Sequence, residues 1–202
     1  MVVTGVGGLQ MRNRFIFLNE VDSTNDYAKQ HLKDLEDGTI ISAKIQNAGR
    51  GQFDRIWLSS EEDIKISLVI KQDIDTKNIY DFSLLPAAAL LRLLHELNIR
   101  AQIKWPNDII VNDRKIAGIL VETSFVSNKL IGIIIGVGLN ISDDNKVMLK
   151  HQIICLKELI KVIPSRNDVI KDFIRHFNDF FDDYLHRGIE EILDFCNENS
   201  YL

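Results

Sequence analysis

The stretch from Ala101 to Ile141 most constrains what this chain can fold into, because it holds four apolar runs separated only by short polar turns. The turns carry Pro-Asn-Asp, Asn-Asp-Arg and Ser-Asn, which are residue types that favour tight reversals of the chain. Runs rich in Ile and Val between such turns are typical of strands, and tight turns join antiparallel neighbours. The sequence therefore predicts an antiparallel sheet built from AQIKW, DIIVN, KIAGILVETSFV and KLIGIIIGVGLNI.

Before this stretch, the sequence predicts three further strands and one helix. The strands are RFIFLNEV, TIISAKIQ and DIKISLVIK. Ser23 or Thr24 can cap the helix, and Gly38 can stop it. The partial alternation of DIKISLVIK suggests an exposed edge strand, through which two copies of the chain could form a homodimer.

The remaining apolar runs have helical spacing. Pro86 stands where the first turn of a helix tolerates proline, ahead of the largely apolar AAALLRLLHELN. From His151 onward the pattern is helical, most clearly in DVIKDFIRHFNDFFDDYLHRG. Strands with helices on one side predict an α+β fold, in which helices pack on a mixed, mainly antiparallel β-sheet.

The composition limits the functions that are open to this chain. Its 202 residues suffice for one main domain, and 46% apolar with 26% charged residues is ordinary for a soluble globular protein. A net charge of -5 without a basic cluster argues against nucleic-acid binding, and no apolar run is long enough to span a membrane. Cys155 and Cys196 form no metal or redox motif, which favours packing roles and a cytoplasmic location. We expect residues 1–13 to be a disordered tail or a cloning remnant.

Four polar clusters fall at predicted strand ends and in loops, where a rigid sheet can direct side chains at a ligand. They are Ser23–Asn25, Gln46–Arg55, Lys104–Asp108 and Lys115–Gly118. In the second cluster, Gly49 and Gly51 let the backbone approach a ligand closely. Arg50 and Arg55 suit phosphate oxygens. Taken alone, this loop is better interpreted as a solvated glycine turn.

The KWPND stretch is more informative. Pro106 holds Trp105 extended, so that Lys104, Asn107 and Asp108 are presented from a strand end. An amide oxygen and a carboxylate at that place can hold Mg²⁺ against a nucleotide. A plain turn explains Pro-Asn-Asp but not the lysine and the tryptophan beside it.

Four segments occur in the order and at about the spacing found in biotin protein ligases. They are DSTN, QNAGRGQFDRIW, KWPNDIIVNDRKIAGILVE and GVGLNIS. The chain resembles that family from Asp22 to Ser142. The resemblance implies an ATP-dependent enzyme that activates biotin as biotinyl-5'-AMP and transfers it to a lysine of a biotin carboxyl carrier protein.

The resemblance also implies a domain organisation. Residues 14–202 would form a catalytic domain similar to those of class II aminoacyl-tRNA synthetases and biotin synthetases. Too few residues flank the motifs for the DNA-binding winged helix of bifunctional members or for the small C-terminal β-barrel domain. We therefore expect a monofunctional ligase.

The resemblance assigns site residues as well. For biotin they are Ser23, Thr24, Gln46, Gly49, Arg50, Lys115 and Gly118. For ATP they are Arg50, Arg55, Trp57, Lys104, Asn107 and Asn140. Lys115 and Arg50 would be the catalytic cations that bring the biotin carboxylate and the α-phosphate of ATP together. Asn107 and Asp108 would position Mg²⁺, and Asp108 would also orient or deprotonate the acceptor amine.

One loop departs from the family pattern. Many members carry GRGRRGR where this chain has Gly49-Arg50-Gly51-Gln52-Phe53-Asp54-Arg55, so that two cations and one glycine are lost. We expect weaker retention of the adenylate and some labelling of bystander lysines.

Two alternative functions remain open. One is a lipoate or octanoate ligase or transferase of the same fold, although neither Cys155 nor Cys196 stands where the transferase needs its cysteine. The other is a non-enzymatic biotin or nucleotide sensor. Retention of Lys115 beside Asn107 and Asp108 argues against the sensor.

Overall fold

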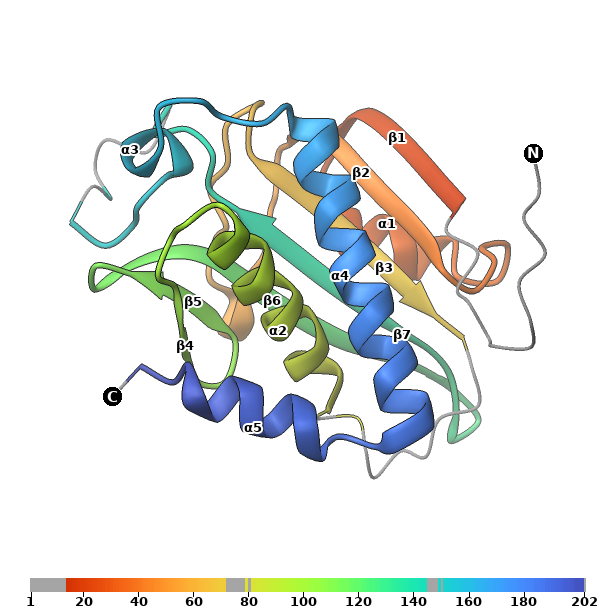
Figure 1. Cartoon of the computed structure of the whole chain (residues 1–202). Helices are drawn as coiled ribbons and strands as arrows, with labels where there is room; N and C mark the ends of the chain where they lie inside the picture. The colour runs from red at the N-terminus through yellow and green to blue at the C-terminus, as the bar shows by residue number, and fades with distance from the viewer. Residues whose placement is uncertain (1–13, 72–78, 80, 145–148, 150, 202) are drawn as a thin grey trace, which may run out of the picture.

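A seven-stranded β-sheet forms the centre of the computed structural model, which describes residues 14–71, 79, 81–144, 149 and 151–201 (Figure 1). The strands lie in the order β1-β2-β3-β7-β6-β5-β4. Their bounds are β1 (Arg14–Val21), β2 (Thr39–Gln46), β3 (Ile64–Ile70), β4 (Gln102–Lys104), β5 (Asp108–Val111), β6 (Arg114–Val126) and β7 (Lys129–Leu139). The pair β1–β2 is parallel, and the other five neighbouring pairs are antiparallel. The predicted mixed, mainly antiparallel sheet is confirmed, whereas the expected tail at 1–13 lies outside the described residues.

Two tight hairpins turn at the residues that the sequence indicated. Asn112 and Asp113 join β5 to β6 with φ of 49° and 61°, and Ser127 and Asn128 join β6 to β7 with φ of 47° and 64°. Two consecutive residues with positive φ match the strand twist in a two-residue hairpin, and Asn and Asp tolerate that conformation well. Local turn chemistry therefore sets the start of the long β6–β7 ladder.

Helices cover the two faces of the sheet unequally. Their bounds are α1 (Thr24–Gln30), α2 (Asp81–Glu96), α3 (Leu156–Leu159), α4 (Arg166–Arg187) and α5 (Glu190–Glu198), with a short 3-10 turn, η1 (Gln52–Asp54). In Figure 1, α2, α4 and α5 lie in front of the sheet and α1 lies behind it. The larger hydrophobic core includes Phe173, Phe177 and Phe181 of α4, and a smaller core packs Ala28 and Leu32 against the other face. None of the described helices is long and apolar enough to cross a membrane.

The start of the second helix was predicted wrongly. Pro86 lies in the interior of α2, which begins at Asp81. A proline there removes a backbone hydrogen bond and crowds the preceding turn, at a cost of about 3 kcal/mol. The extra turn, however, buries Phe82 and Leu85 completely, and burial of two large apolar side chains can offset that cost.

The end of the first helix was also predicted wrongly. The helix ends at Gln30 and not near Gly38. Gly38 instead adopts a φ of 77°, and its N–H donates to Val69 O at 2.9 Å. This glycine therefore turns the chain into β2 rather than stopping the helix.

The strand predicted to lie at an exposed edge is central instead. β3 lies between β2 and β7, and all seven of its residues are buried. Its polar and apolar residues alternate incompletely because both faces are covered, so that no solvated face is needed. Pairing of two copies through β3 is therefore excluded.

The two edges of the sheet are β1 and β4. On the outer side of β4, Ile103 N donates to Asn199 O and Tyr201 N donates to Ile103 O, both at 2.8 Å. The last described residues of the chain thus pair along this edge.

Candidate active site

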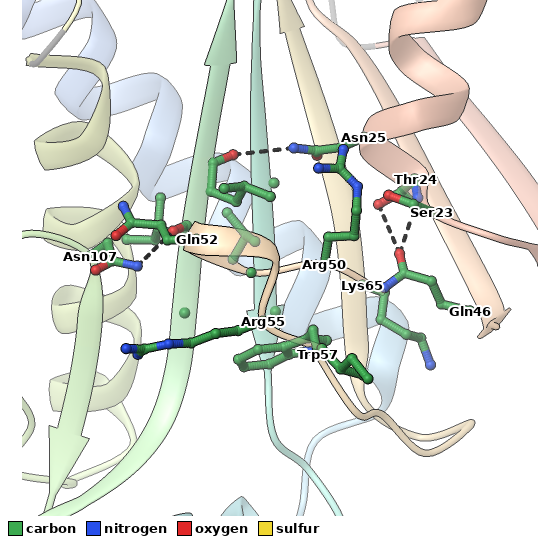
Figure 2. Close-up of a pocket in the computed structure, with 18 of the residues that line it drawn as sticks. Ser23, Thr24, Asn25, Gln46, Arg50, Gln52, Arg55, Trp57, Lys65 and Asn107 are labelled. Atoms are coloured by element: carbon green, nitrogen blue, oxygen red, sulfur yellow. Dashed lines mark hydrogen bonds between the residues drawn. The ribbon is translucent and has the colours of Figure 1, made fainter. Parts of the chain in front are cut away.

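A pocket opens on the α1 side of the sheet, across β3, β7 and β6 (Figure 2). It holds about 820 Å³ of empty space, counting its open mouth. The lining residues are Ser23, Thr24, Asn25, Gln46, Arg50, Gly51, Gln52, Arg55, Ile56, Trp57, Lys65, Ile66, Asn107, Asp108, Lys115, Gly118, Ile119, Leu120, Gly136, Val137 and Gly138.

Hydroxyl and amide groups gather in one part of the pocket, where Figure 2 shows Ser23, Thr24 and Gln46 together. Ser23 caps α1, since its Oγ accepts a hydrogen bond from Asp26 N at 3.3 Å. Thr24 donates twice to Gln46 Oε1, from N at 3.0 Å and from Oγ1 at 3.3 Å. Ser67 Oγ donates in turn to Thr24 Oγ1 at 2.8 Å. Fixed donors and acceptors of this kind can recognise a neutral polar group.

A lysine and a carboxylate from the β5–β6 hairpin also face the pocket. Lys115 Nζ lies 2.6 Å from Asp108 Oδ1, and the two side chains are 28% and 26% exposed. The same ammonium lies 5.2 Å from the centroid of the Trp57 ring. The cation is thus held between a carboxylate and an aromatic face.

A β-bulge directs Lys115 into the pocket. In its pairing with β5, β6 carries one extra residue, Ile116. Ile116 and Ala117 therefore both enter the core, while Lys115 and Gly118 both line the pocket. In a regular strand successive side chains alternate, and Lys115 would share the core face with Ala117.

Glycines on β6 and β7 make room for two side chains on the sheet. A Cβ at Gly118 would lie 2.9 Å from Trp57 Cζ3, and a Cβ at Gly138 would overlap the indole. A Cβ at Gly136 would lie 2.6 Å from Asn25 Oδ1. Within the described part of the chain, the buried Trp57 Nε1 has no hydrogen-bond partner.

Arg50 reaches the pocket from the loop between β2 and β3, and two carboxylates hold it. Its Nε and Nη2 donate to Asp26 at 3.1 and 2.5 Å, and Nη2 lies 3.3 Å from both oxygens of Glu122. The hydrogen bond to Asp26 raises the pKa of Arg50. Burial tends to raise the pKa of Glu122, but hydrogen bonds from Lys29 and Asn25, with the nearby positive charges, leave that pKa below its ordinary value. The guanidinium and the Glu122 carboxylate are therefore both charged at neutral pH.

Asn107 and Asp108 could contribute to a metal site only together with a ligand. Asn107 Nδ2 donates to Ile119 O at 3.1 Å, so the side-chain oxygen of Asn107 is the atom left to coordinate. No cluster of three His, Cys, Asp or Glu side chains suited to a metal occurs in the described ranges. Mg²⁺ is commonly bound by one or two protein oxygens together with substrate phosphates. The pair fits that mode and does not form a closed metal cage.

The sequence profile of the biotin/lipoate A/B protein ligase family matches residues 17–140, which is more than half of the chain. The chain belongs to this family. The bifunctional ligase/repressor BirA of Bacillus spizizenii is 31% identical over 188 residues, covering 90% of this chain and 58% of that protein. Biotin–protein ligase 2 of Arabidopsis thaliana is 26% identical over 185 residues, covering 85% of this chain and 54% of that protein. The chain thus spans just over half of the length of these two relatives.

Solved structures of biotin protein ligases have the same fold. The Aquifex aeolicus biotin protein ligase in complex with biotin and ATP has a TM-score of 0.84 and 25% sequence identity, covering 94% of this chain and 78% of that one. The expected relationship to the biotin protein ligase catalytic fold is confirmed.

Most residues assigned from the resemblance to biotin protein ligases meet in this one pocket. Those that line it are Ser23, Thr24, Gln46, Arg50, Arg55, Trp57, Asn107, Asp108, Lys115 and Gly118. Gly49 lies directly behind them, since a Cβ there would lie 2.5 Å from Trp57 O and would overlap the Gln46 side chain. Lys115, Arg50 and Asn107 therefore lie on the same side of the sheet.

The structure places two residues assigned to ATP outside the pocket lining. Lys104 is exposed on the edge strand β4, with its Nζ 5.9 Å from the centroid of the Tyr201 ring. Asn140 is buried, and its Nδ2 donates to Lys115 O at 3.2 Å. Asn140 thus fixes the backbone that carries the pocket lysine, because it follows the end of β7, next to that part of β6.

Reasoning from the sequence missed Glu122, Lys65 and the role of Gly136 and Gly138. Each of the two charged residues stands inside an otherwise apolar strand run, and an isolated charge in such a run is the signal that could have found them. Lys65 is 2% exposed, and its Nζ donates to three backbone carbonyl oxygens at 2.5, 2.8 and 3.5 Å. The glycines stand within the quoted GVGLNIS segment, but their spacing alone does not show which side chains they admit.

Proposed function

We propose that this chain is the catalytic domain of an ATP-dependent biotin protein ligase that modifies a biotin carboxyl carrier protein. The observation that carries the proposal is Lys115, paired with Asp108, in a pocket that also holds the Thr24–Gln46 hydroxyl and amide groups. One relative named above is a bifunctional ligase/repressor, the other is a biotin–protein ligase, and the Aquifex aeolicus neighbour is a biotin protein ligase in complex with biotin and ATP.

Biotin matches the distribution of groups in the pocket. It is a neutral ureido bicycle on an apolar arm that ends in a carboxylate. Ser23, Thr24 and Gln46 offer hydroxyl and amide groups for the ureido ring, and Lys115 offers a cation for the carboxylate. Gly118 keeps the strand between these two ends free of a side chain.

In the first half-reaction, a biotin carboxylate oxygen would attack the α-phosphorus of ATP, and the bond to pyrophosphate would break. Two anions must approach each other, so a fixed cation at Lys115 lowers the electrostatic part of the barrier. Arg55 would neutralise the phosphates, and Trp57 would lie beside the adenine. Mg²⁺, when held by the phosphates with Asn107 and Asp108, would supply further charge neutralisation to the leaving pyrophosphate.

In the second half-reaction, the neutral ε-amine of an acceptor lysine would attack the carbonyl of biotinyl-5'-AMP, releasing AMP. Asp108 would orient that amine or take its proton, a role that its position in the same pocket as Lys115 supports. The variant Asp108→Asn should slow transfer from preformed biotinyl-5'-AMP more than it slows adenylate synthesis. An equal loss in both steps would contradict this role.

Incubation with biotin, Mg-ATP and a biotin carboxyl carrier domain tests the proposed reaction. We expect the acceptor to gain the mass of one biotinyl group, detected by mass spectrometry. Replacement of biotin by lipoate tests the nearest alternative, and modification with lipoate alone would overturn the assignment of substrate. Binding of biotin without any transfer would favour the sensor.

We also propose a cytoplasmic location. Neither Cys155 nor Cys196 forms a disulfide in the described part of the chain, and both are buried, which accords with a reducing compartment. Burial raises the pKa of the Cys196 thiol to about 12, so this thiol stays protonated and unreactive in the folded protein.

A further inference from the structure

Glu122 on β6 is a partly buried carboxylate that the proposed chemistry does not use. Its side chain is 16% exposed. It accepts hydrogen bonds from Asn25 Nδ2 at 2.8 Å, from Lys29 Nζ, and from Arg50 Nη2 at 3.3 Å. These donors come from α1 and from the loop between β2 and β3, so one carboxylate connects two separate walls of the pocket.

The loop has little else to hold its tip in place. Between Gly49 and Trp57 the backbone bonds close on the loop itself, since Gly51 N donates to Arg55 O at 2.7 Å and Trp57 N donates to Gly49 O at 2.8 Å, whereas just before them Ala48 N donates to Asp22 O at 2.8 Å. At the tip, Phe53 is 87% exposed. The Arg50 side chain therefore gives this turn its polar connection to α1 and β6, beside the Trp57 indole that packs over Gly118 of β6.

Asp26 is the second carboxylate that binds Arg50. Its two oxygens accept from Nε and Nη2 in a fork, and Glu122 accepts from Nη2 on the other side. Among the described residues none accepts from Nη1, although Arg50 lines the pocket. Figure 2 shows the Arg50 side chain directed toward Asn25 and away from Arg55.

We infer that Glu122 is a positioning residue of this site, which together with Asp26 holds Arg50 so that the β2–β3 loop is docked before a ligand arrives. Nη1 then remains as a directed donor for the ligand. The network extends further, because Asn25 Oδ1 accepts from Ser67 Oγ at 2.5 Å, and Ser67 also contacts Thr24. Glu122 therefore positions Arg50 and the Thr24–Gln46 end of the pocket together.

Limited trypsin proteolysis without any ligand tests the docking. Trypsin cleaves after arginine, so mass spectrometry can follow the Arg50–Gly51 and Arg55–Ile56 bonds separately. In Glu122→Gln, which keeps the size and one acceptor oxygen but loses the charge, we expect cleavage at Arg50–Gly51 to become about tenfold faster, since proteolysis follows the population of the open loop. The matched control is Glu36→Gln, which removes an exposed carboxylate paired with Arg14 outside the pocket and should leave this cleavage unchanged.

A second measurement separates positioning from a general structural role and rests on the proposed function. In biotin-dependent pyrophosphate exchange, Glu122→Gln should raise the KM for biotin about tenfold with a smaller change in kcat, and Glu122→Asp should recover part of the loss. If Glu122→Gln fails to fold, Asp26→Asn removes the charge of the other carboxylate that binds Arg50 and should give the same cleavage pattern. Cleavage at wild-type rates in folded Glu122→Gln, judged by circular dichroism, would overturn the inference. Failure of the proposed ligase would instead leave the proteolysis result intact, since that assay uses neither biotin nor ATP.

Discussion

Lys115 Nζ and Asp108 Oδ1 form an ion pair of 2.6 Å across the β5–β6 hairpin, directly above Gly118. A Cβ at Gly118 would lie 3.0 Å from the same ammonium, so the missing side chain leaves the space that the lysine occupies. The cation is thus in place before a ligand enters the pocket. A charge that needs no rearrangement during the reaction is the most effective form of electrostatic stabilisation.

Replacement of Lys115 should therefore abolish most adenylation. We expect Lys115→Gln to lower kcat in biotin-dependent pyrophosphate exchange by about 10²–10³-fold, the usual effect of losing one preorganised charge-stabilising group. Lys129→Gln, an exposed lysine at the β6–β7 turn, is the matched control. Near-normal exchange by Lys115→Gln would show that another cation serves the reaction.

A methyl group at Gly138 should displace Trp57 from the sheet. The Cβ of Gly138→Ala would overlap the indole, so we expect biotin and ATP to bind at least about tenfold more weakly, as loss of a packed contact worth about 1.4 kcal/mol predicts. Tryptophan fluorescence in a Trp105→Phe background would report the displacement. The control is Gly132→Ala, whose Cβ would meet the flexible end of Leu32 at 3.0 Å. An unchanged spectrum and affinity in Gly138→Ala would contradict the position of the indole.

The charge on Glu122 should make stability depend on pH. The pKa of Glu122 in the folded protein lies below its ordinary value of 4.5, because hydrogen bonds and charges from Lys29, Asn25 and Arg50 outweigh burial. A carboxylate with a lowered pKa contributes stability above its unfolded pKa, and that contribution is lost as the pH falls through the folded value. We expect wild type to exceed Glu122→Gln by about 1–3 kcal/mol in urea unfolding at pH 7, with the gap closing below about pH 4.5. A gap independent of pH would mean that the charge is not the source.

The loop sequence should also affect release of the intermediate. Gln52 and Phe53 stand where many biotin protein ligases carry arginine, so we expect biotinyl-5'-AMP to escape and label bystander lysines. In a mixed lysate with biotin and ATP, Gln52→Arg should reduce this labelling while leaving modification of the carrier domain intact. Strictly acceptor-dependent biotinylation by the wild type would refute the prediction.

The parts of the fold that the sequence predicted are those set by local chemistry. The Asn112-Asp113 and Ser127-Asn128 turns and the strands that they join follow from residue types a few positions apart. The central place of β3 was missed because its partial alternation was taken for the pattern of an edge strand, whereas a strand covered on both faces also alternates incompletely. Position within a sheet is a property of the whole fold.

The candidate site was likewise predicted only in part from the sequence. The motifs identified most of the lining residues because each motif stands at a strand end or loop where side chains face a ligand. The extra residue at Ile116 decides that Lys115 faces the pocket. This bulge could not be predicted from the sequence, because Ile116 is one apolar residue among several. Asn140 and Lys104 were expected to bind ATP, but neither lines the pocket. A motif gives the order of its residues along the chain and not the direction of each side chain.

Pairing of the final described residues with β4 also restricts how copies of this chain can associate. With Asn199 and Tyr201 bonded along that side, β1 is the open edge of the sheet within the described ranges, and its Phe15 and Phe17 side chains are 39% and 63% exposed. Two copies that joined strand to strand would have to meet β1 against β1, and neither would then offer a further edge. Such an assembly would close as a symmetric pair and would not grow into a fibre.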